Sequence, residues 1–176
     1  MRKGSTLLLS ILAISLFVPL GLVQSTSAMK HGWCIRPYEA HVNSTLTLPP
    51  SEPWTFDDIV FIKDWHYQSY YYEGTLSEWG DVTEDFWIKL LVLNTKTGEG
   101  FGIVKWLITV DTSGTLEGIT TVKVTGGIFC SGRSFSTEGT GVLEDVRLYV
   151  SFDGWHPNGN LALYERWDSG IIIYED

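Results

Sequence analysis

The chain has 176 residues, of which 44% are hydrophobic and 19% charged, and it carries 21 acidic against 12 basic side chains. A surface with a formal net charge of −9 repels the phosphate backbone, so the composition argues against nucleic-acid binding.

The first 28 residues have the pattern of a secretory signal peptide. Two basic residues stand at the N-terminus, an apolar run extends from Leu7 to Val23, and small polar residues follow over 25–28. Because Thr26 and Ala28 place small side chains where a signal peptidase binds, we expect cleavage after Ala28. An uncleaved membrane anchor is the alternative, since a largely apolar run of 17 residues is at the short end of what a bilayer of about 30 Å requires.

A signal peptide would direct the rest of the chain out of the cytoplasm. We expect a secreted or extracytoplasmic protein that has no membrane segment once residues 1–28 are removed. Cleavage removes two basic residues and no acidic one, which leaves a formal net charge of −11. The remaining 148 residues fit one domain, large enough to bury about two thirds of its unfolded surface.

The segment from Met29 to about Pro53 shows no clear period and contains four prolines. It predicts an extended N-terminal arm over residues 29–56, followed by a β domain over 57–176. Asn43 in this arm begins an Asn-Ser-Thr acceptor sequence, which a host with N-glycosylation would modify.

Cys34 and Cys130 are the only two cysteines. An exported chain passes through oxidising surroundings, where a pair of cysteines usually closes into a disulfide. We therefore expect a bridge that ties the arm to the domain and stabilises the fold by roughly 4–5 kcal/mol, if the geometry permits.

Beyond the arm, short β-rich runs alternate with turn residues, as in a meander of antiparallel strands. The expected strands cover residues 59–63, 65–75, 86–94, 101–111, 115–125, 133–138, 142–152, 160–167 and 170–175. The alternation is clearest over 142–152, where every second residue from Val146 to Phe152 is apolar. Turn residues such as Asp153-Gly154 and Asn158-Gly159 favour hairpins between neighbouring strands.

Glycines recur between Glu99 and Val142, at positions 114, 118, 126, 127, 132, 139 and 141, and Tyr72-Glu-Gly-Thr-Leu76 precedes them. This rhythm of strands and glycines resembles the β-barrels of the allene oxide cyclase and dirigent type, and lipocalin-like barrels have a similar one. The resemblance implies a closed barrel with a small lumen, often in a homo-oligomer. The expected fold class is thus all-β, an eight-stranded up-and-down antiparallel barrel, with a β-sandwich as the alternative.

The densest aromatic cluster runs from Trp65 to Tyr72. Strand alternation sends Trp65, Tyr67 and Tyr71 to one face and His66, Tyr70 and Tyr72 to the other. Such a row stacks on a sugar or lines an apolar cavity, and it also serves as ordinary cross-strand packing. We assign Trp65, Tyr67, Tyr70, Tyr71 and Tyr72 as the candidate ligand-binding residues.

The candidate acid–base residues are His66 and Glu144. His66 would act as a general base if a carboxylate such as Glu73 or Glu165 lies beside it, and it is otherwise an ordinary strand residue. Glu144 and Glu138 point inward by strand parity, and burial would raise their pKa, unless they lie at a strand end in solvent.

No cofactor is expected, because the sequence contains no zinc pattern, phosphate loop, nucleophile elbow or dinucleotide fingerprint. The acidic clusters at Asp57-Asp58 and Asp81–Asp85 do not match the spacing of a calcium loop, so we interpret them as solvated surface. No metal site is predicted.

Three functions remain open from the sequence. The first is a non-enzymatic exported barrel that binds a small apolar or sugar-like ligand, or a protein partner, through its aromatic residues. The second is an enzyme of isomerase or lyase type with His66 or Glu144 in the lumen. The third is a structural protein of the cell envelope that assembles through strands with apolar residues on both faces.

Overall fold

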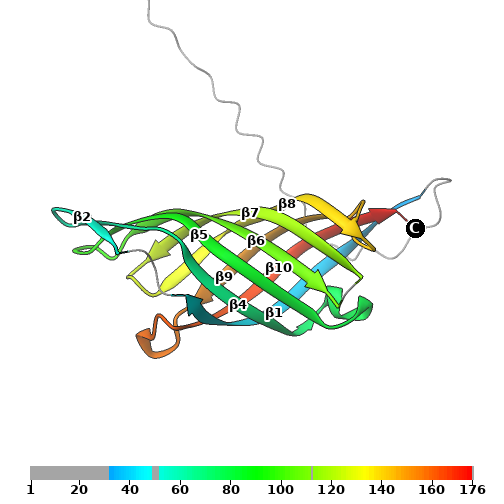
Figure 1. Ribbon diagram of the computed structural model, residues 1–176, viewed down its shortest axis with the longest axis horizontal. Helices are drawn as coiled ribbons and strands as arrows, with labels where there is room; N and C mark the ends of the chain where they lie inside the picture. Colours follow the sequence, from blue (N-terminus) through cyan, green and yellow to red (C-terminus); the bar gives the residue numbers. More distant parts are fainter. Residues whose placement is uncertain (1–31, 49–51, 112, 176) are drawn as a thin grey trace, which may run out of the picture.

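The computed structural model describes residues 32–48, 52–111 and 113–175, and the predicted signal peptide lies outside these ranges. Eight long strands make up most of the described chain (Figure 1). They are β1 (Trp33–Leu48), β4 (Trp65–Gly74), β5 (Val82–Asn94), β6 (Gly100–Val110), β7 (Gly114–Thr125), β8 (Phe129–Gly141), β9 (Arg147–Trp155) and β10 (Leu163–Glu175).

These strands close into an antiparallel barrel. From β4 to β10 each strand pairs with the next along the chain, and β1 pairs with both β4 and β10. No barrel strand is left with an open edge, which removes the unpaired backbone groups that an open sheet exposes. The prediction of a closed eight-stranded meander is confirmed, and the sandwich alternative is excluded.

The N-terminal arm expected over residues 29–56 is not separate from the barrel. Strand β1 pairs with β10 from Trp33 to Thr45 and with β4 from Ala40 to Leu48. The prolines are compatible with this strand. Pro37 lies in the stretch of β1 that pairs only with β10, and the other three prolines follow the end of β1 in the sequence. The barrel domain therefore begins at β1, and the expected boundary at residue 57 falls within it.

Several strand boundaries differ from the prediction. Strand β5 begins at Val82 rather than at residue 86, and β8 covers Phe129–Gly141 rather than 133–138. Strand β9 begins at Arg147, and the preceding residues form a turn in which the Val142 side chain is 58% exposed. The two runs expected at 160–167 and 170–175 are one strand, β10, because Gly170 continues the ladder with both neighbouring strands.

One end of the barrel is packed shut. The short 3-10 helix η1 (Thr75–Trp79) places Leu76 in the core, and the β8–β9 turn adds Leu143 and Val146. All three side chains are at most 2% exposed. This end lies near the C-terminus in Figure 1, with η1 drawn in green.

The other end carries the β2–β3 hairpin and the β9–β10 loop (Figure 1). Strands β2 (Trp54–Phe56) and β3 (Ile59–Ile62) extend the sheet from β5 beyond the barrel wall. The β9–β10 loop contains the 3-10 turn η2 (Pro157–Gly159), in which Asn158 and Gly159 have positive φ angles as their turn-forming sequence predicts. We call this end the mouth of the barrel.

The expected disulfide is wrong: both cysteines are free thiols. Cys130 on β8 is in register with Gly154 on β9, Gly154 with Arg166 on β10, and Arg166 with Val42 on β1. Cys34 lies eight residues before Val42, about 26 Å along the strand. A disulfide needs Cα atoms within about 7 Å, so the barrel fixes the two thiols too far apart to join.

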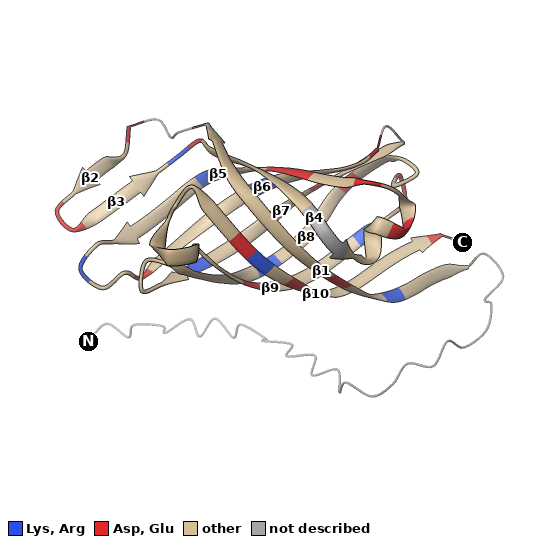
Figure 2. Ribbon diagram, turned by 90° about the horizontal axis from the view of Figure 1, so that it is seen from below, with Lys and Arg blue, Asp and Glu red and all other residues tan. Residues whose placement is uncertain are grey.

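Charged residues are distributed along the strands, with Lys and Arg dispersed among the acidic residues (Figure 2). Within the described ranges, the structure contains no helix with the length and hydrophobicity needed to cross a lipid bilayer.

Candidate ligand-binding cavity

A cavity of about 120 Å³ occupies the mouth half of the barrel. Its wall comes from all eight barrel strands except β1, from Ile62 of β3 and from the β9–β10 loop. It reaches the surface at Leu161, whose side chain is 44% exposed. The apolar residues that line it are Ile62, Trp65, Tyr67, Phe86, Ile88, Leu91, Leu93, Val104, Trp106, Val122, Val124, Phe152, Leu161 and Tyr164.

Strand periodicity explains why these side chains gather inside. Alternate residues of β5 (82, 84, 86) and of β7 (116, 118, 120, 122, 124) are buried, and the residues between them face outward. The interior row of β7 is apolar except for Gly118 and Thr120. The wall is therefore built from the period-2 pattern of the strands themselves.

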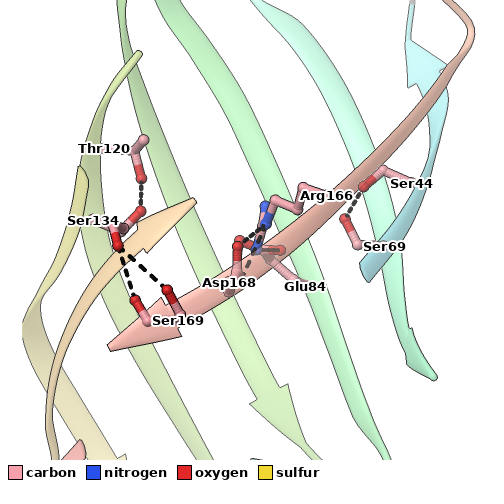
Figure 3. A network of polar contacts seen from close by, with 9 residues as sticks. Ser44, Ser69, Glu84, Thr120, Ser134, Arg166, Asp168 and Ser169 are labelled. Atoms are coloured by element: carbon pink, nitrogen blue, oxygen red, sulfur yellow. Dashed lines mark hydrogen bonds and ion pairs between the residues drawn. The ribbon is translucent and has the colours of Figure 1, made fainter. Parts of the chain in front are cut away.

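A buried ionic cluster borders the cavity, whose lining includes Glu84 and Arg166. Figure 3 shows these two side chains together with Asp168, and we call the three residues the floor of the cavity. Arg166 donates from Nη2 to Oε2 of Glu84 at 2.7 Å, and from Nε to both carboxylate oxygens of Asp168 at 2.9 and 3.1 Å. Glu84 is 2% and Asp168 8% exposed. A charge at this depth requires a partner, and the guanidinium serves two carboxylates at once.

Burial shifts the protonation of both acids. Loss of hydration raises the pKa of Glu84 and of Asp168 above their ordinary values, and the attraction of Arg166 opposes the rise in each case. Asp168 also raises the pKa of Glu84, because two carboxylates share one cation. The net charge of the cluster is −1 when both acids are ionised, and it is zero when one of them is protonated.

Two pairs of hydroxyl groups cross the interior (Figure 3). Oγ1 of Thr120 on β7 bonds Oγ of Ser134 on β8, and both residues line the cavity. Oγ of Ser44 on β1 bonds Oγ of Ser69 on β4 at 2.7 Å. Each pair satisfies small polar side chains that strand alternation places inside.

Two indole groups of the cavity wall lack a hydrogen-bond partner. Among the described residues, Nε1 of Trp65 and Nε1 of Trp106 are buried and have no acceptor. An unsatisfied buried donor costs about 1–3 kcal/mol, and such groups in native proteins are few. Trp106 is only 2% exposed, so bulk water does not satisfy it in the structure.

His156 and Tyr67 hold the β9–β10 loop over the mouth. Tyr67 donates its hydroxyl to the carbonyl oxygen of Leu161 at 2.7 Å. Nδ1 of His156 lies 2.8 Å from the carbonyl oxygen of Leu163, and since a carbonyl only accepts, Nδ1 carries the proton. Burial lowers the pKa of His156, partly offset by this hydrogen bond, so the imidazole is neutral at pH 7.

Cys130 also lines the cavity, beside the aromatic wall. Burial raises the pKa of its thiol to about 11, and burial is the principal cause of the raised pKa of Tyr67 and Tyr164. All three groups are therefore protonated at neutral pH.

The structure brings together some of the aromatic residues that the sequence nominated. Trp65 and Tyr67 line the cavity, whereas Tyr70 is on the outer face with 56% of its surface exposed. The backbone of Tyr71 and Tyr72 belongs to β4, and their side chains lie outside the described part of the structure.

His66 lies on the outer face of the barrel, away from the lumen. Its Nε2 is 2.8 Å from Oδ1 of Asp85, its Nδ1 is 2.6 Å from Oγ1 of Thr47, and its ring stacks on Trp87. Of the two carboxylates proposed as its partner, Glu165 instead pairs with His41 at 2.8 Å, and the side chain of Glu73 is not described. A lumenal acid–base role for His66 does not fit this placement.

Glu144 and Glu138 are both exposed, contrary to the inward orientation predicted from strand parity. Glu144 lies in the β8–β9 turn, so the parity of β9 does not extend to it. A register shift between Glu117 and Gly118, opposite β8, makes Ser136 the last inward residue before Glu138. In the described chain, no three His, Cys, Asp or Glu side chains are grouped to hold a metal ion.

Asn43 lies between the buried Val42 and Ser44, so its side chain is on the outer face of β1. Its glycosylation remains a prediction.

The sequence analysis did not predict the ionic floor. Glu84 was grouped with the surface acids of 81–85, although it stands between Val82 and Phe86 in an alternating row. Arg166 and Asp168 likewise continue the inward row from Tyr164 to Ile172. The available signal was a charged residue that interrupts such a row on each of two distant strands, and Glu84 and Arg166 carry opposite charges.

Comparisons of the chain with protein-family models, with curated proteins and with solved structures gave no significant match. The fold and the cavity describe the protein by its architecture: it is a β-barrel closed at one end, with an apolar cavity at the other.

Proposed function

We propose that this protein binds a small, mainly apolar molecule in the cavity at the mouth of the barrel. The observation that supports the proposal is the contrast between the two ends of the barrel. Leu76, Leu143 and Val146 are buried in the core at one end, while the other end keeps an apolar cavity that reaches the surface. A barrel that served only as a scaffold would gain stability by filling both ends.

The dimensions of the cavity define the scale of the ligand. An apolar cavity of about 150 Å³ is sufficient to bind benzene, so about 120 Å³ accommodates a group of roughly one small ring or a short branched chain. A larger ligand would extend past Leu161 into solvent. Apolar walls with a few polar groups at defined places are typical of small-molecule sites.

The export of the protein is part of the proposal and rests on residues 1–28. A secreted or extracytoplasmic barrel with this cavity would capture or carry a small molecule outside the cytoplasm.

A cavity-filling variant tests the proposal. Val122 lines the cavity from β7, and the next residue, Thr121, faces solvent on the same strand. Toluene should raise the melting temperature of the mature protein and of Thr121→Phe but should leave that of Val122→Phe unchanged. Circular dichroism of both variants checks that the barrel has formed, and a wild-type protein whose melting temperature does not respond to toluene would contradict the proposal.

Native mass spectrometry of protein secreted by its own cells provides the second measurement. A retained small molecule that Val122→Phe loses and Thr121→Phe keeps would identify the class of the natural ligand. Retention by both variants would place that molecule outside the cavity.

A further inference from the structure

We infer that the cavity selects an uncharged ligand that carries a hydrogen-bond acceptor, such as a carbonyl or ether oxygen, for the indole N–H groups of Trp65 and Trp106. The inference rests on the proposed ligand-binding function and adds the chemical class of the ligand. It follows from the balance of donors and acceptors in the cavity and from the charges of its floor.

Donors without acceptors are the distinctive polar feature of the wall. Both indole nitrogens belong to cavity-lining side chains, and within the described chain neither has an acceptor. Thr120 and Ser134 bond to each other, and because such a pair uses one of its two hydroxyl protons, the second remains to be donated. A ligand oxygen would accept from these groups, whereas a pure hydrocarbon would leave them unsatisfied.

The floor disfavours an anionic ligand. Arg166 is the cation of the cavity lining, and it already bonds the carboxylates of Glu84 and Asp168 at 2.7–3.1 Å. A ligand carboxylate would meet Glu84 at the floor without a further cation to balance it. A ligand ammonium has no acceptor to offer the indoles, so a neutral oxygen fits the cavity best.

The position of Trp106 is fixed by its neighbour across the sheet. Gly118 on β7 is in register with Trp106 on β6, and a Cβ atom at 118 would lie 2.0 Å from Cζ2 of the indole ring. The absence of a side chain at 118 lets the ring pack closely against β7. Trp106 is therefore a fixed donor of the wall rather than a mobile side chain.

Three probes with the same ring separate the chemistries: toluene, acetophenone and benzoate. We expect calorimetric titration of the mature protein to show that acetophenone binds about tenfold more tightly than toluene, as one hydrogen bond to a buried donor predicts. Benzoate should bind more weakly than toluene. Acetophenone should also move the indole N–H resonances of Trp65 and Trp106 in a ¹⁵N-labelled protein, and toluene should shift them less.

A substitution of the donor completes the test. Trp106→Phe should remove most of the preference for acetophenone while retaining toluene binding, whereas Phe86→Leu should weaken both probes alike because it removes no hydrogen-bond donor from the wall. If toluene binds and acetophenone binds no tighter, with the indole resonances unmoved, the assignment of an acceptor is wrong and the binding function stands. If none of the probes binds, the proposed function itself fails.

Discussion

Arg166 on β10 reaches across the lumen to Glu84 on β5, three strands away around the barrel, and Nη2 lies 2.7 Å from Oε2. Within its own strand the same guanidinium holds Asp168 through Nε. One cation thus joins two walls of the barrel that share no backbone hydrogen bond. The three charges therefore depend on one another, because removing the cation leaves both buried carboxylates without a partner.

Arg166→Met should therefore lower the free energy of unfolding by about 3–5 kcal/mol, because it leaves two buried carboxylates without a cation. Urea denaturation of a protein that lacks residues 1–28 measures this loss. The triple variant Glu84→Gln, Arg166→Met, Asp168→Asn carries no charge in the floor and should recover most of it. A triple variant as unstable as Arg166→Met would show that packing of the arginine stem, rather than charge, dominates.

The pH dependence of stability should carry a contribution from His156. Its pKa is lowered in the folded barrel, whereas in the unfolded chain it is about 6.5, so the unfolded state binds more protons just below that pH. The stabilisation is present above pH 6.5 and is lost as the pH falls through the folded-state pKa. The wild type should therefore lose stability relative to His156→Gln as the pH falls from 7.5 to 5.

The comparison with His156→Gln is needed because the floor acids act in the opposite direction. The raised pKa of Glu84 and Asp168 means that they gain protons more readily when folded, so acidification stabilises the barrel through them. This contribution is the same in the wild type and in His156→Gln, so it cancels in the difference between their free energies of unfolding. A difference that stays constant across this pH range would contradict the burial of His156.

The sequence predicted the strands and their closure better than it predicted the contents of the lumen. Turn residues and alternation locate most barrel strands, because both are local properties. Strand β1 escaped detection since Pro37 and the lack of a strict period hid a strand that lies between two partners. The ionic floor escaped for a different reason: Glu84 and Arg166 are 82 residues apart, and only closure of the barrel makes them neighbours.

The cysteine prediction failed for a physical reason that the sequence does not contain. Two cysteines in an exported chain favour a bridge on chemical grounds, but closure places Cys34 near the packed end and Cys130 near the mouth. We expect reduction to leave the intact mass of the purified protein unchanged, and denaturation without reductant to expose two thiols to iodoacetamide. An intramolecular mass deficit of two hydrogens would contradict the strand register.

The thiol of Cys130 should react slowly in the folded protein. Its pKa of about 11 leaves little thiolate at pH 8, and its side chain faces the cavity. In a Cys34→Ser background, the rate of reaction with a disulfide reagent should be at least tenfold lower when folded than in urea, on the order expected from the shift in thiolate fraction. Bound toluene should slow it further, and the Cys130→Ser protein provides the baseline.

Gly118 should be intolerant of any side chain, although it lies in the middle of an ordinary strand. A Cβ atom there would meet the indole ring of Trp106 at 2.0 Å and the carbonyl oxygen of Phe135 at 2.4 Å, so both the wall and the β7–β8 ladder would have to move. Gly118→Ala should lower the free energy of unfolding by about 1–3 kcal/mol, the usual range for overpacking, and should weaken acetophenone binding by displacing the donor. Gly126→Ala provides the contrast: its Cβ meets no atom within 4 Å but its positive φ of 61° adds backbone strain, so its loss of stability should leave the ligand preference unchanged. If Gly118→Ala bound acetophenone as tightly as the wild type, Trp106 would not need a fixed position to serve the ligand.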